Sequence, residues 1–336
     1  MRRAVTRKVL CAKSKANLPK SRIVSSGLGG MGTLYNRIVA AKGTGRYCVI
    51  RRIGGIGDVI MALPTLRQLK TEFPKIHLTF AIDMHTTGNN VYYELCKNLP
   101  YIDALLDARF VQRNTFDALV DISSVCIRYE NAGLPTMNRI DIFARAAGIP
   151  RLFSALPNYI VEPKEAQWAR VQVAGPRKAS KKIVILHTAS MEPKRCWPVE
   201  KYLEIVKKAE TEHPSLHFIV LDFNGKYDKW HTHTNVSDYS RTTLREMAAL
   251  INEADFFIGP DSGPMHLAGA LQKKSIVIFG SIPPEARINH YLYHEGMRLD
   301  GLPCLGCWYK PCPIGEKCMK DLPFERVYNR MVARLF

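Results

Sequence analysis

The chain has 336 residues, of which 48 are lysine or arginine and 30 are aspartate or glutamate, giving a formal net charge of +18. This length allows two α/β domains with well-buried cores. No apolar run approaches the roughly 18 residues that a membrane-spanning helix needs, so we expect no segment to cross a bilayer.

The positive charge is concentrated at the amino end. The first 57 residues hold 13 lysines and arginines and no acidic residue, whereas the remainder holds 35 basic and 30 acidic residues. We predict that residues 1–45 form a basic, flexible arm. A solvated tail or an arm that contacts an anionic membrane is favoured over a transit peptide, and nucleic acid is not an expected partner.

The arm contains one motif that resembles a dinucleotide-binding loop. Residues 27–32 (GLGGMG) have the G-x-G-x-x-G spacing, and a short strand and a helix are possible on either side. The acidic residue expected about 20 positions later is absent, because the first acid in the chain is Asp58. We interpret the loop as a glycine-rich hinge, with a nucleotide loop as the alternative.

The rest of the chain alternates strand-like runs with helix-length segments, which is typical of parallel sheets. The predicted strands are 47–52, 76–82, 102–106, 117–122, 183–188, 217–222, 255–259 and 275–280. The pattern predicts an α/β protein with two doubly wound domains that face each other across a cleft. The expected boundaries are residues 1–45 for the arm, 46–160 and 180–300 for the two domains, and 301–336 for a cysteine-rich segment and a C-terminal helix.

The first of these strands leads into a glycine-rich turn, residues 53–58 (IGGIGD), and then a helix. The turn departs from the dinucleotide pattern at its third glycine, and Asp58 puts a carboxylate where a pyrophosphate would sit. A carboxylate repels phosphate there, but it can accept a proton from a neutral hydroxyl, as a general base does. The alternative role of Asp58 is that of a helix cap.

A basic loop, residues 192–198 (EPKRCWP), follows the strand at 183–188. It lies at the carboxyl edge of the expected sheet, where ligands bind in doubly wound folds. Lys194 and Arg195 are candidates for binding phosphates, and Thr188 is a candidate for a phosphate hydrogen bond. The alternative is a solvated loop without a ligand.

A phosphate cradle, residues 261–266 (DSGPMH), is predicted between a buried strand and an alanine-rich helix. Pro264 suits a first helical position because it has no N–H group. The free N–H groups and the dipole of the helix start favour an anion such as a diphosphate, and His266 in the first turn can meet the same oxygens. Three residues supply cap chemistry and permissive backbone: Asp261, Ser262 and Gly263. A capped helix with no ligand is the alternative.

A cysteine knuckle is predicted near the carboxyl end, where four of the nine cysteines fall within fifteen residues. These cysteines are Cys304, Cys307, Cys312 and Cys318. Their C-x2-C-x4-C-x5-C spacing is compact enough to wrap one tetrahedral metal ion, with free or disulfide-bonded thiols as the alternative. The other five cysteines are scattered, which fits a reducing cytoplasm.

Several of these segments together resemble glycosyltransferase family 9, the lipopolysaccharide heptosyltransferases. Residues 57–59 (GDV) are similar to the Gly-Asp pair that opens the first helix of that family, and the phosphate cradle is similar to its Asp-Ser/Thr-Gly-Pro-x-His run. Further matches occur in order at residues 139–149, at Trp197-Pro198 and at 275–280. The resemblance covers about residues 47–330.

The resemblance implies the two-domain GT-B fold, with an acceptor-side N-terminal domain and a C-terminal domain that binds a nucleotide-diphosphate sugar, ADP-heptose being favoured. The implied reaction moves the sugar to a hydroxyl of a surface glycan or a protein without a catalytic metal. Asp58 would deprotonate that hydroxyl, and Asp261 would order its loop or hold sugar hydroxyls. The charge on the leaving diphosphate would be stabilised by Lys194 or Arg195, Ser262, Gly263 and His266.

Some details of the family pattern are open in this chain. The family places a lysine two residues before the Trp-Pro pair, where this chain has Arg195, with Lys194 one position earlier. Some relatives bind iron through a cysteine cluster, so both zinc and iron are candidates for the cysteine knuckle. The expected location is the cytoplasm, with peripheral contact to the membrane. The alternative functions are a nucleotide-sugar epimerase of the same fold and a non-catalytic basic binding protein.

Overall fold

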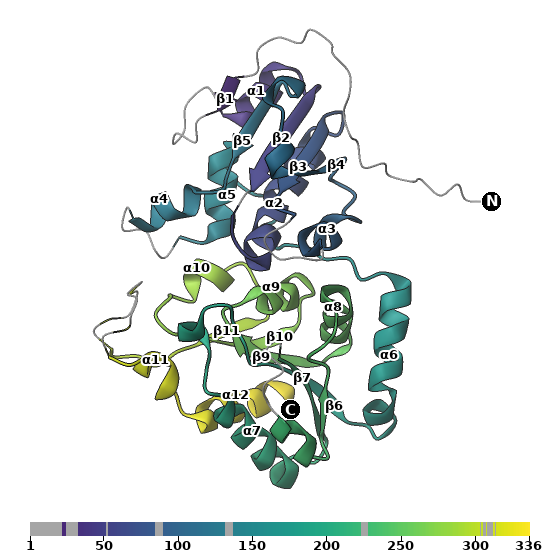
Figure 1. Ribbon diagram of the computed structural model, residues 1–336, viewed down its shortest axis with the longest axis vertical. Helices are drawn as coiled ribbons and strands as arrows, with labels where there is room; N and C mark the ends of the chain where they lie inside the picture. The colour runs from purple at the N-terminus through teal and green to yellow at the C-terminus, as the bar shows by residue number, and fades with distance from the viewer. Residues whose placement is uncertain are drawn as a thin grey trace, which may run out of the picture. The chain divides into compact units, whose positions relative to one another are not determined.

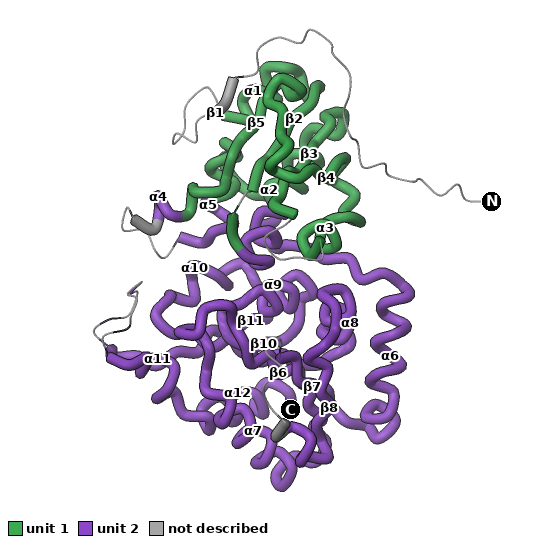
Figure 2. Tube along the Cα trace, viewed as in Figure 1, with its two compact units in different colours: residues 1–54, 65–126, 143–153 green, residues 55–64, 127–142, 154–336 purple. Residues whose placement is uncertain are grey.

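The structure is a computed structural model that describes residues 22–24, 33–51, 53–84, 90–131, 137–222, 228–302, 304, 307, 312 and 314–336. The glycine-rich loop at 27–32 lies outside the described residues. The chain divides into two compact units (Figure 2): unit 1 comprises residues 1–54, 65–126 and 143–153, and unit 2 comprises residues 55–64, 127–142 and 154–336.

The described residues of unit 1 form a parallel sheet in the strand order β1-β5-β2-β3-β4 (Figure 1). Its strands are β1 (Arg22–Val24), β2 (Arg46–Arg51), β3 (His77–Ile82), β4 (Ala104–Asp107) and β5 (Ala118–Asp121). Apart from their first residues, β2 and β3 are buried throughout, because a parallel sheet is covered on both faces. The chain passes from the edge strand β1 to the central β2, then outward to β3 and β4, and returns as β5 between β1 and β2.

The helices of this part of the chain are α1 (Leu34–Ala40), α2 (Ile56–Glu72), α3 (Val91–Cys96), α4 (Val125–Asn131) and α5 (Arg139–Ala147), with 3-10 turns η1 (Ala108–Phe110) and η2 (Arg113–Thr115). By the contact division, α2, α4 and α5 each belong partly to unit 1 and partly to unit 2. The start of α2 and the first turn of α5 are in unit 2.

The prediction of a flexible arm through residue 45 is wrong for its described residues. Strand β1 pairs in parallel with β5, with Arg22 opposite Ala118. Helix α1 is capped by the Thr33 side chain, which accepts a hydrogen bond from the Asn36 backbone N–H, and its apolar residues Leu34 and Ile38 are fully buried. The burial of these two aliphatic side chains favours an ordered helix here.

Unit 2 contains a second parallel sheet, in the order β11-β10-β9-β6-β7-β8 over the described residues. Its strands are β6 (Lys182–His187), β7 (Leu216–Leu221), β8 (Val236–Asp238), β9 (Phe256–Pro260), β10 (Lys274–Ile278) and β11 (His294–Met297). The chain starts at β6, passes outward to β7 and β8, and then returns to the other side of β6 at β9. The strands β6 and β9 therefore form a topological switch point, and the crevice beyond their carboxyl ends is where such sheets bind ligands.

The helices of unit 2 are α6 (Pro163–Lys178), α7 (Val199–Glu212), α8 (Leu244–Glu253), α9 (Gly263–Ala270), α10 (Glu285–Ile288), α11 (Lys317–Lys320) and α12 (Phe324–Leu335), with 3-10 turns η3 (Pro193–Arg195) and η4 (Asp228–Thr232). A large apolar core joins α7 and α12 to the strands. Trp197 is buried in this core, and its indole N–H donates to the Leu322 carbonyl at 3.2 Å. This contact ties the basic loop to the segment that follows the cysteine knuckle.

The prediction of an α/β fold with parallel sheets is confirmed, and all eight predicted strands occur within two residues of their expected bounds. The short strands β8 and β11 were missed. No helix among the described residues is both long enough and apolar enough to span a membrane.

Candidate functional site

Two predicted site residues lie at the switch point of the unit 2 sheet. Thr188 follows directly after β6, and Asp261 follows directly after β9. Both side chains are buried. Since β6 and β9 are paired neighbours, these two positions lie at the same edge of the sheet.

Helix α9 starts in the phosphate cradle, as expected, but its cap differs from the prediction. Ser262 occupies the N-cap position with an extended backbone, φ −154° and ψ 172°. Its hydroxyl donates to the Pro260 carbonyl at 3.2 Å and makes no capping bond to the helix. Pro264 lies within the first two helical positions. The Ser262 side chain therefore leaves the N–H groups of the first turn for another partner, as an anion site requires.

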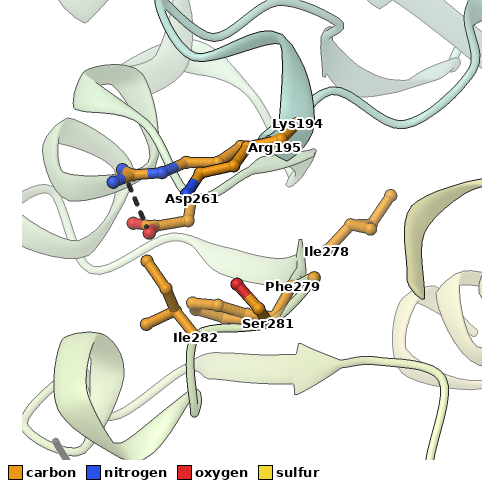
Figure 3. Close-up of a pocket in the computed structure, with 8 residues that line it drawn as sticks. Lys194, Arg195, Asp261, Ile278, Phe279, Ser281 and Ile282 are labelled. Carbon is orange, nitrogen blue, oxygen red and sulfur yellow. Dashed lines mark ion pairs between the residues drawn. The ribbon is translucent and has the colours of Figure 1, made fainter. Parts of the chain in front are cut away.

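The basic loop meets the cradle through Arg195. Its Nη1 lies 3.3 Å from Asp261 Oδ2, and its Nε lies 3.2 Å from Glu192 Oε2. Figure 3 shows the Arg195 side chain reaching over to the Asp261 carboxylate. Lys194 is near Glu192, with Nζ 3.9 Å from Oε2, and Arg287 Nε is 3.8 Å from Asp261 Oδ2. Cations thus gather around a buried carboxylate at the start of α9.

A small pocket lies at this ion pair. Its polar wall is formed by Lys194, Arg195 and Asp261, and its apolar wall includes Ile278, Phe279 and Ile282 (Figure 3). The cavity volume is about 10 Å³, which is room for roughly one water molecule. The pocket is too small for a nucleotide while Arg195 reaches across to Asp261.

Helix α2 begins at Ile56, before Asp58 and not after it as expected, so Asp58 lies within the first turn, and it is buried. Its Oδ1 accepts a 2.7 Å hydrogen bond from Arg139 Nη1, and its Oδ2 accepts a 3.2 Å hydrogen bond from the Gly55 backbone N–H. The second contact has the form of a capping interaction, so the carboxylate does cap the helix. The first contact is an ion pair whose side chains are only 16% and 10% exposed.

His266 is the residue that brings the two predicted segments together. A Cβ placed on Gly57 would lie 2.8 Å from His266 Nε2 and closer still to Cδ2, so the imidazole edge rests on the start of α2. Similarly, a Cβ on Gly263 would lie 3.0 Å from the Ile56 side chain. The starts of α2 and α9 are therefore adjacent within unit 2, and Asp58 is among the charges that act on His266.

Burial lowers the pKa of His266 from 6.5 to about 4, and this effect outweighs the opposing influence of its charged neighbours. The carboxylates of Asp261 and Asp58 act to raise the pKa, whereas Arg287 and Arg139 act to lower it. The imidazole is consequently neutral at pH 7. Its Nδ1 lies 2.6 Å from the Tyr291 hydroxyl.

Sequence reasoning assigned no role to several residues that surround this site. Arg139 and Tyr291 contact the two predicted residues Asp58 and His266. Arg139 begins the segment 139–149 that resembles the family, but it was given no role, and Tyr291 lies in no motif. His187 ends β6 and Asp222 follows β7, and both are buried. A polar residue at the carboxyl end of an apolar strand indicates the ligand-binding edge of a parallel sheet, and this signal applies to both residues.

The cysteine knuckle is only partly assembled over the described residues. The backbone N–H of Cys307 donates to the Cys304 carbonyl at 3.1 Å, and the Glu316 N–H donates to Cys312 Sγ at 3.3 Å. Burial is the main cause of a raised pKa at Cys318, and the three other thiols of the knuckle add to it. Among the described residues, however, no three histidine, cysteine or acidic side chains are close enough to hold a metal ion. The prediction of a metal cage is not supported by this geometry.

Comparisons with known proteins identify the family. Residues 138–312, just over half of the chain, match the model of glycosyltransferase family 9 (heptosyltransferase). Lipooligosaccharide heptosyltransferase 2 of Campylobacter jejuni is 39% identical over 97 residues, a match that spans 27% of this chain and 29% of that relative. Lipopolysaccharide heptosyltransferase 1 of Campylobacter coli is 23% identical over 295 residues, 70% of this chain and 84% of the relative.

Solved structures show the same fold. The ADP-heptose lipopolysaccharide heptosyltransferase II of E. coli superimposes with a TM-score of 0.63 at 15% identity, covering 86% of this chain and 98% of the other. The iron-containing dodecameric glycosyltransferase TibC from enterotoxigenic E. coli superimposes with a TM-score of 0.61 at 14% identity, covering 87% of this chain and 78% of the other. At these identities the likeness concerns the fold alone.

Proposed function

Because the chain belongs to glycosyltransferase family 9, we propose that it transfers a heptose from ADP-heptose to a hydroxyl of a glycan that resembles the lipopolysaccharide core. The names of the two Campylobacter relatives and of the E. coli heptosyltransferase support this sugar and this donor. The chain matches less than a third of the length of the C. jejuni relative, so the activity of the whole protein is part of the proposal.

One observation carries the proposed mechanism: the first turn of α2 with Asp58 and the first turn of α9 with His266 lie against each other. These turns come from segments more than 200 residues apart in the chain. One supplies a carboxylate, and the other supplies a helix N-terminus with cations beside it. A base next to an anion site is what transfer from a diphosphate to a hydroxyl requires.

Asp58 is proposed as the general base that takes the proton from the acceptor hydroxyl. The hydroxyl oxygen then attacks the anomeric carbon of the sugar, and the bond from that carbon to the diphosphate breaks. In the structure, one carboxylate oxygen of Asp58 is bonded to Arg139 and the other to the Gly55 N–H. An acceptor hydroxyl therefore has to approach Asp58 beside these contacts or replace one of them.

The donor diphosphate is proposed to bind at the start of α9, where Ser262 and Gly263 present backbone N–H groups and Thr188 supplies a hydroxyl. Lys194 and Arg195 would neutralise the charge that grows on the leaving diphosphate. Because Arg195 reaches across to Asp261, we expect a bound diphosphate to draw this guanidinium away from the carboxylate. Arg287, which lies 3.8 Å from the same carboxylate, would then remain as its cation.

The four cysteines of the knuckle are proposed to bind one structural zinc or iron ion. Thiolates are the preferred ligands of such ions, and the electrostatic influence of the other three thiols on Cys318 indicates that the side chains are near one another. Iron is one candidate because TibC is an iron-containing glycosyltransferase. The described geometry lacks a finished cage, so metal binding would have to close the knuckle.

The basic residues before β1 are proposed to contact an anionic membrane or glycan surface at the cytoplasmic face, and nucleic acid is not an expected partner. Residues 2–20 contain seven of the thirteen positive charges of the amino end. Deleting them should weaken binding to vesicles of anionic lipid at low salt and leave transfer to a soluble acceptor nearly unchanged. A loss of ADP binding in this variant would contradict the assignment.

The experiment that tests the proposed function is a direct transfer assay. Purified protein is incubated with ADP-heptose and a lipopolysaccharide core acceptor that lacks heptose, and the product is analysed by mass spectrometry. We expect the acceptor to gain the mass of one heptose and ADP to be released. ADP release without glycan modification, or a donor changed only in stereochemistry, would contradict the proposal, and the latter would favour an epimerase.

A further inference from the structure

The aromatic ring of Tyr291 is fitted closely to helix α9. Tyr291 follows α10 and is 4% exposed. A Cβ placed on Gly269 would lie only 2.8 Å from atoms of the Tyr291 ring, so the ring occupies the space that a side chain at 269 would need. Gly269 lies three residues after His266, on the same face of α9. The glycine thus lets the tyrosine approach the histidine.

The Tyr291 hydroxyl and His266 form a buried hydrogen bond whose direction can be assigned. Oη lies 2.6 Å from Nδ1, and among the described residues Oη makes no other hydrogen bond. A buried phenol O–H needs an acceptor, and Nδ1 is the acceptor within reach. The hydroxyl therefore donates to Nδ1, and a neutral imidazole must then carry its proton on Nε2. Burial keeps this imidazole neutral by lowering the pKa of His266 to about 4.

The Nε2 edge of the ring faces the other way, toward the start of α2. A Cβ placed on Gly57 would lie 2.8 Å from Nε2. This edge of the ring therefore rests on Gly57, the residue before Asp58. On the Nδ1 side of the imidazole, Tyr291 is itself held by His294. The His294 ring packs on Tyr291 with centroids 5.0 Å apart, and His294 Nε2 lies 3.0 Å from the Met265 carbonyl. The imidazole is therefore fixed at both edges.

We propose that Tyr291 is a positioning residue that holds His266 as the neutral Nε2–H tautomer, so that the imidazole donates a hydrogen bond to a diphosphate oxygen of the donor bound at the start of α9. This inference rests on the proposed function. A neutral donor suits the place because a charged imidazole would attract the Asp58 carboxylate, which the mechanism needs for the acceptor proton. His266 acts here as neither acid nor base.

The tautomer is tested in the free protein, independently of activity. Two-dimensional ¹⁵N NMR of protein labelled at histidine distinguishes protonated from unprotonated ring nitrogens, and His266→Gln identifies the His266 signals. We expect Nε2 protonated and Nδ1 unprotonated at neutral pH in the wild type, and a mixture of tautomers in Tyr291→Phe. A protonated Nδ1 in the wild type, or the same spectrum in Tyr291→Phe, overturns the inference.

A matched pair of variants tests the role toward the ligand, with ADP as the probe in calorimetry. The side-chain amide of glutamine places an N–H near the position of Nε2, whereas that of asparagine reaches only the position of Nδ1. We expect His266→Gln to bind ADP within about threefold of wild type and His266→Asn to bind it about tenfold or more weakly. Equal weakening in both variants overturns the inference. Absence of ADP binding in the wild type instead contradicts the proposed function, and the NMR result still decides the tautomer.

Discussion

His266 lies so close to Gly57 that a Cβ at position 57 would come within 2.8 Å of its Nε2. This contact joins the two segments that the sequence marked separately, a glycine-rich turn near the amino end and a strand-turn-helix near residue 260. It also gives the glycine a steric role, because the site needs the absence of a side chain at 57. At the neighbouring Gly55, no atom of the described residues other than its chain neighbours lies within 4 Å of the corresponding Cβ position.

Gly57→Ala should therefore displace the His266 ring or the start of α2. We expect turnover in the transfer assay to fall by about tenfold or more, since a displaced imidazole no longer meets the diphosphate. Gly55→Ala is the matched control, in the same turn but with open space around the added methyl group. Equal activities for the two variants would show that the contact between residues 57 and 266 is unimportant.

The cations of the basic loop should decide the affinity for the donor diphosphate. We expect the double change Lys194→Ala with Arg195→Ala to weaken ADP binding by about tenfold or more, because it removes both positive side chains from the start of α9. Calorimetry with ADP measures the effect. The control is Lys207→Ala with Lys208→Ala on α7, which removes the same charge from a site where both lysines pair with glutamates of their own helix. Similar ADP affinities for the two double variants would mean that the basic loop attracts ADP only through its net charge and does not form part of a specific phosphate site.

The cysteine knuckle should contain metal in purified protein. We expect elemental analysis to find about one zinc or iron ion per chain in the wild type and much less in Cys307→Ser. Cys126→Ala, which changes a buried thiol on α4, is the control and should retain the metal. Wild-type protein that is free of metal and fully stable would rule out a structural metal in the knuckle.

The buried histidines should make the protein sensitive to mild acid. Burial lowers the pKa of His187 and His266 to about 4 and that of His294 to about 3, from an ordinary value of 6.5. The unfolded chain binds these protons near pH 6.5 and the folded chain does not, so stability that is present above pH 6.5 is lost as the pH falls toward 4. Each such histidine should contribute about 1.4 kcal/mol per pH unit in this window.

Urea unfolding between about pH 7.5 and about pH 4.5 measures this loss. The midpoint should fall with pH in the wild type, and it should fall less steeply in His266→Gln, because glutamine does not titrate. Parallel pH dependences for the two proteins would mean that His266 is not a buried neutral group. The comparison uses the slope alone, so a constant difference in stability between the proteins does not affect it.

The sequence predicted most of the sheets because their strands are continuous apolar runs buried on both faces. It failed for β8 and β11, which have three and four residues and are only partly buried. It allowed a helix in the region of α1 but assigned that region to a flexible arm, because the burial of α1 cannot be read from a basic composition. It placed the cap of α9 within residues 261–263, and Ser262 does occupy the N-cap position, but its hydroxyl donates to the Pro260 carbonyl and makes no capping bond.

The site was predictable where residues are close in the chain and not where they meet only after folding. The phosphate cradle and the glycine-rich turn are local patterns, and both were found. Arg139 meets Asp58 across 81 positions, and Tyr291 meets His266 across 25. Arg139 begins the matched segment 139–149, but nothing in that segment marks Asp58 as its partner. Tyr291 lies in a turn without a motif, so its contact with His266 becomes visible only in the folded chain.

The central claim, that Asp58 is the base, is tested most directly by the turnover of Asp58→Asn in the transfer assay with ADP-heptose. Asparagine keeps the size and the capping ability of aspartate but cannot take a proton. We predict that turnover falls by about 100-fold or more while ADP affinity changes little. Asp141→Asn, in the first turn of α5 and bonded to His290 at 3.0 Å, is the control and should stay near wild type. Near-normal turnover in Asp58→Asn would contradict the account, because it would leave Asp58 only as the helix cap that accepts the Gly55 N–H.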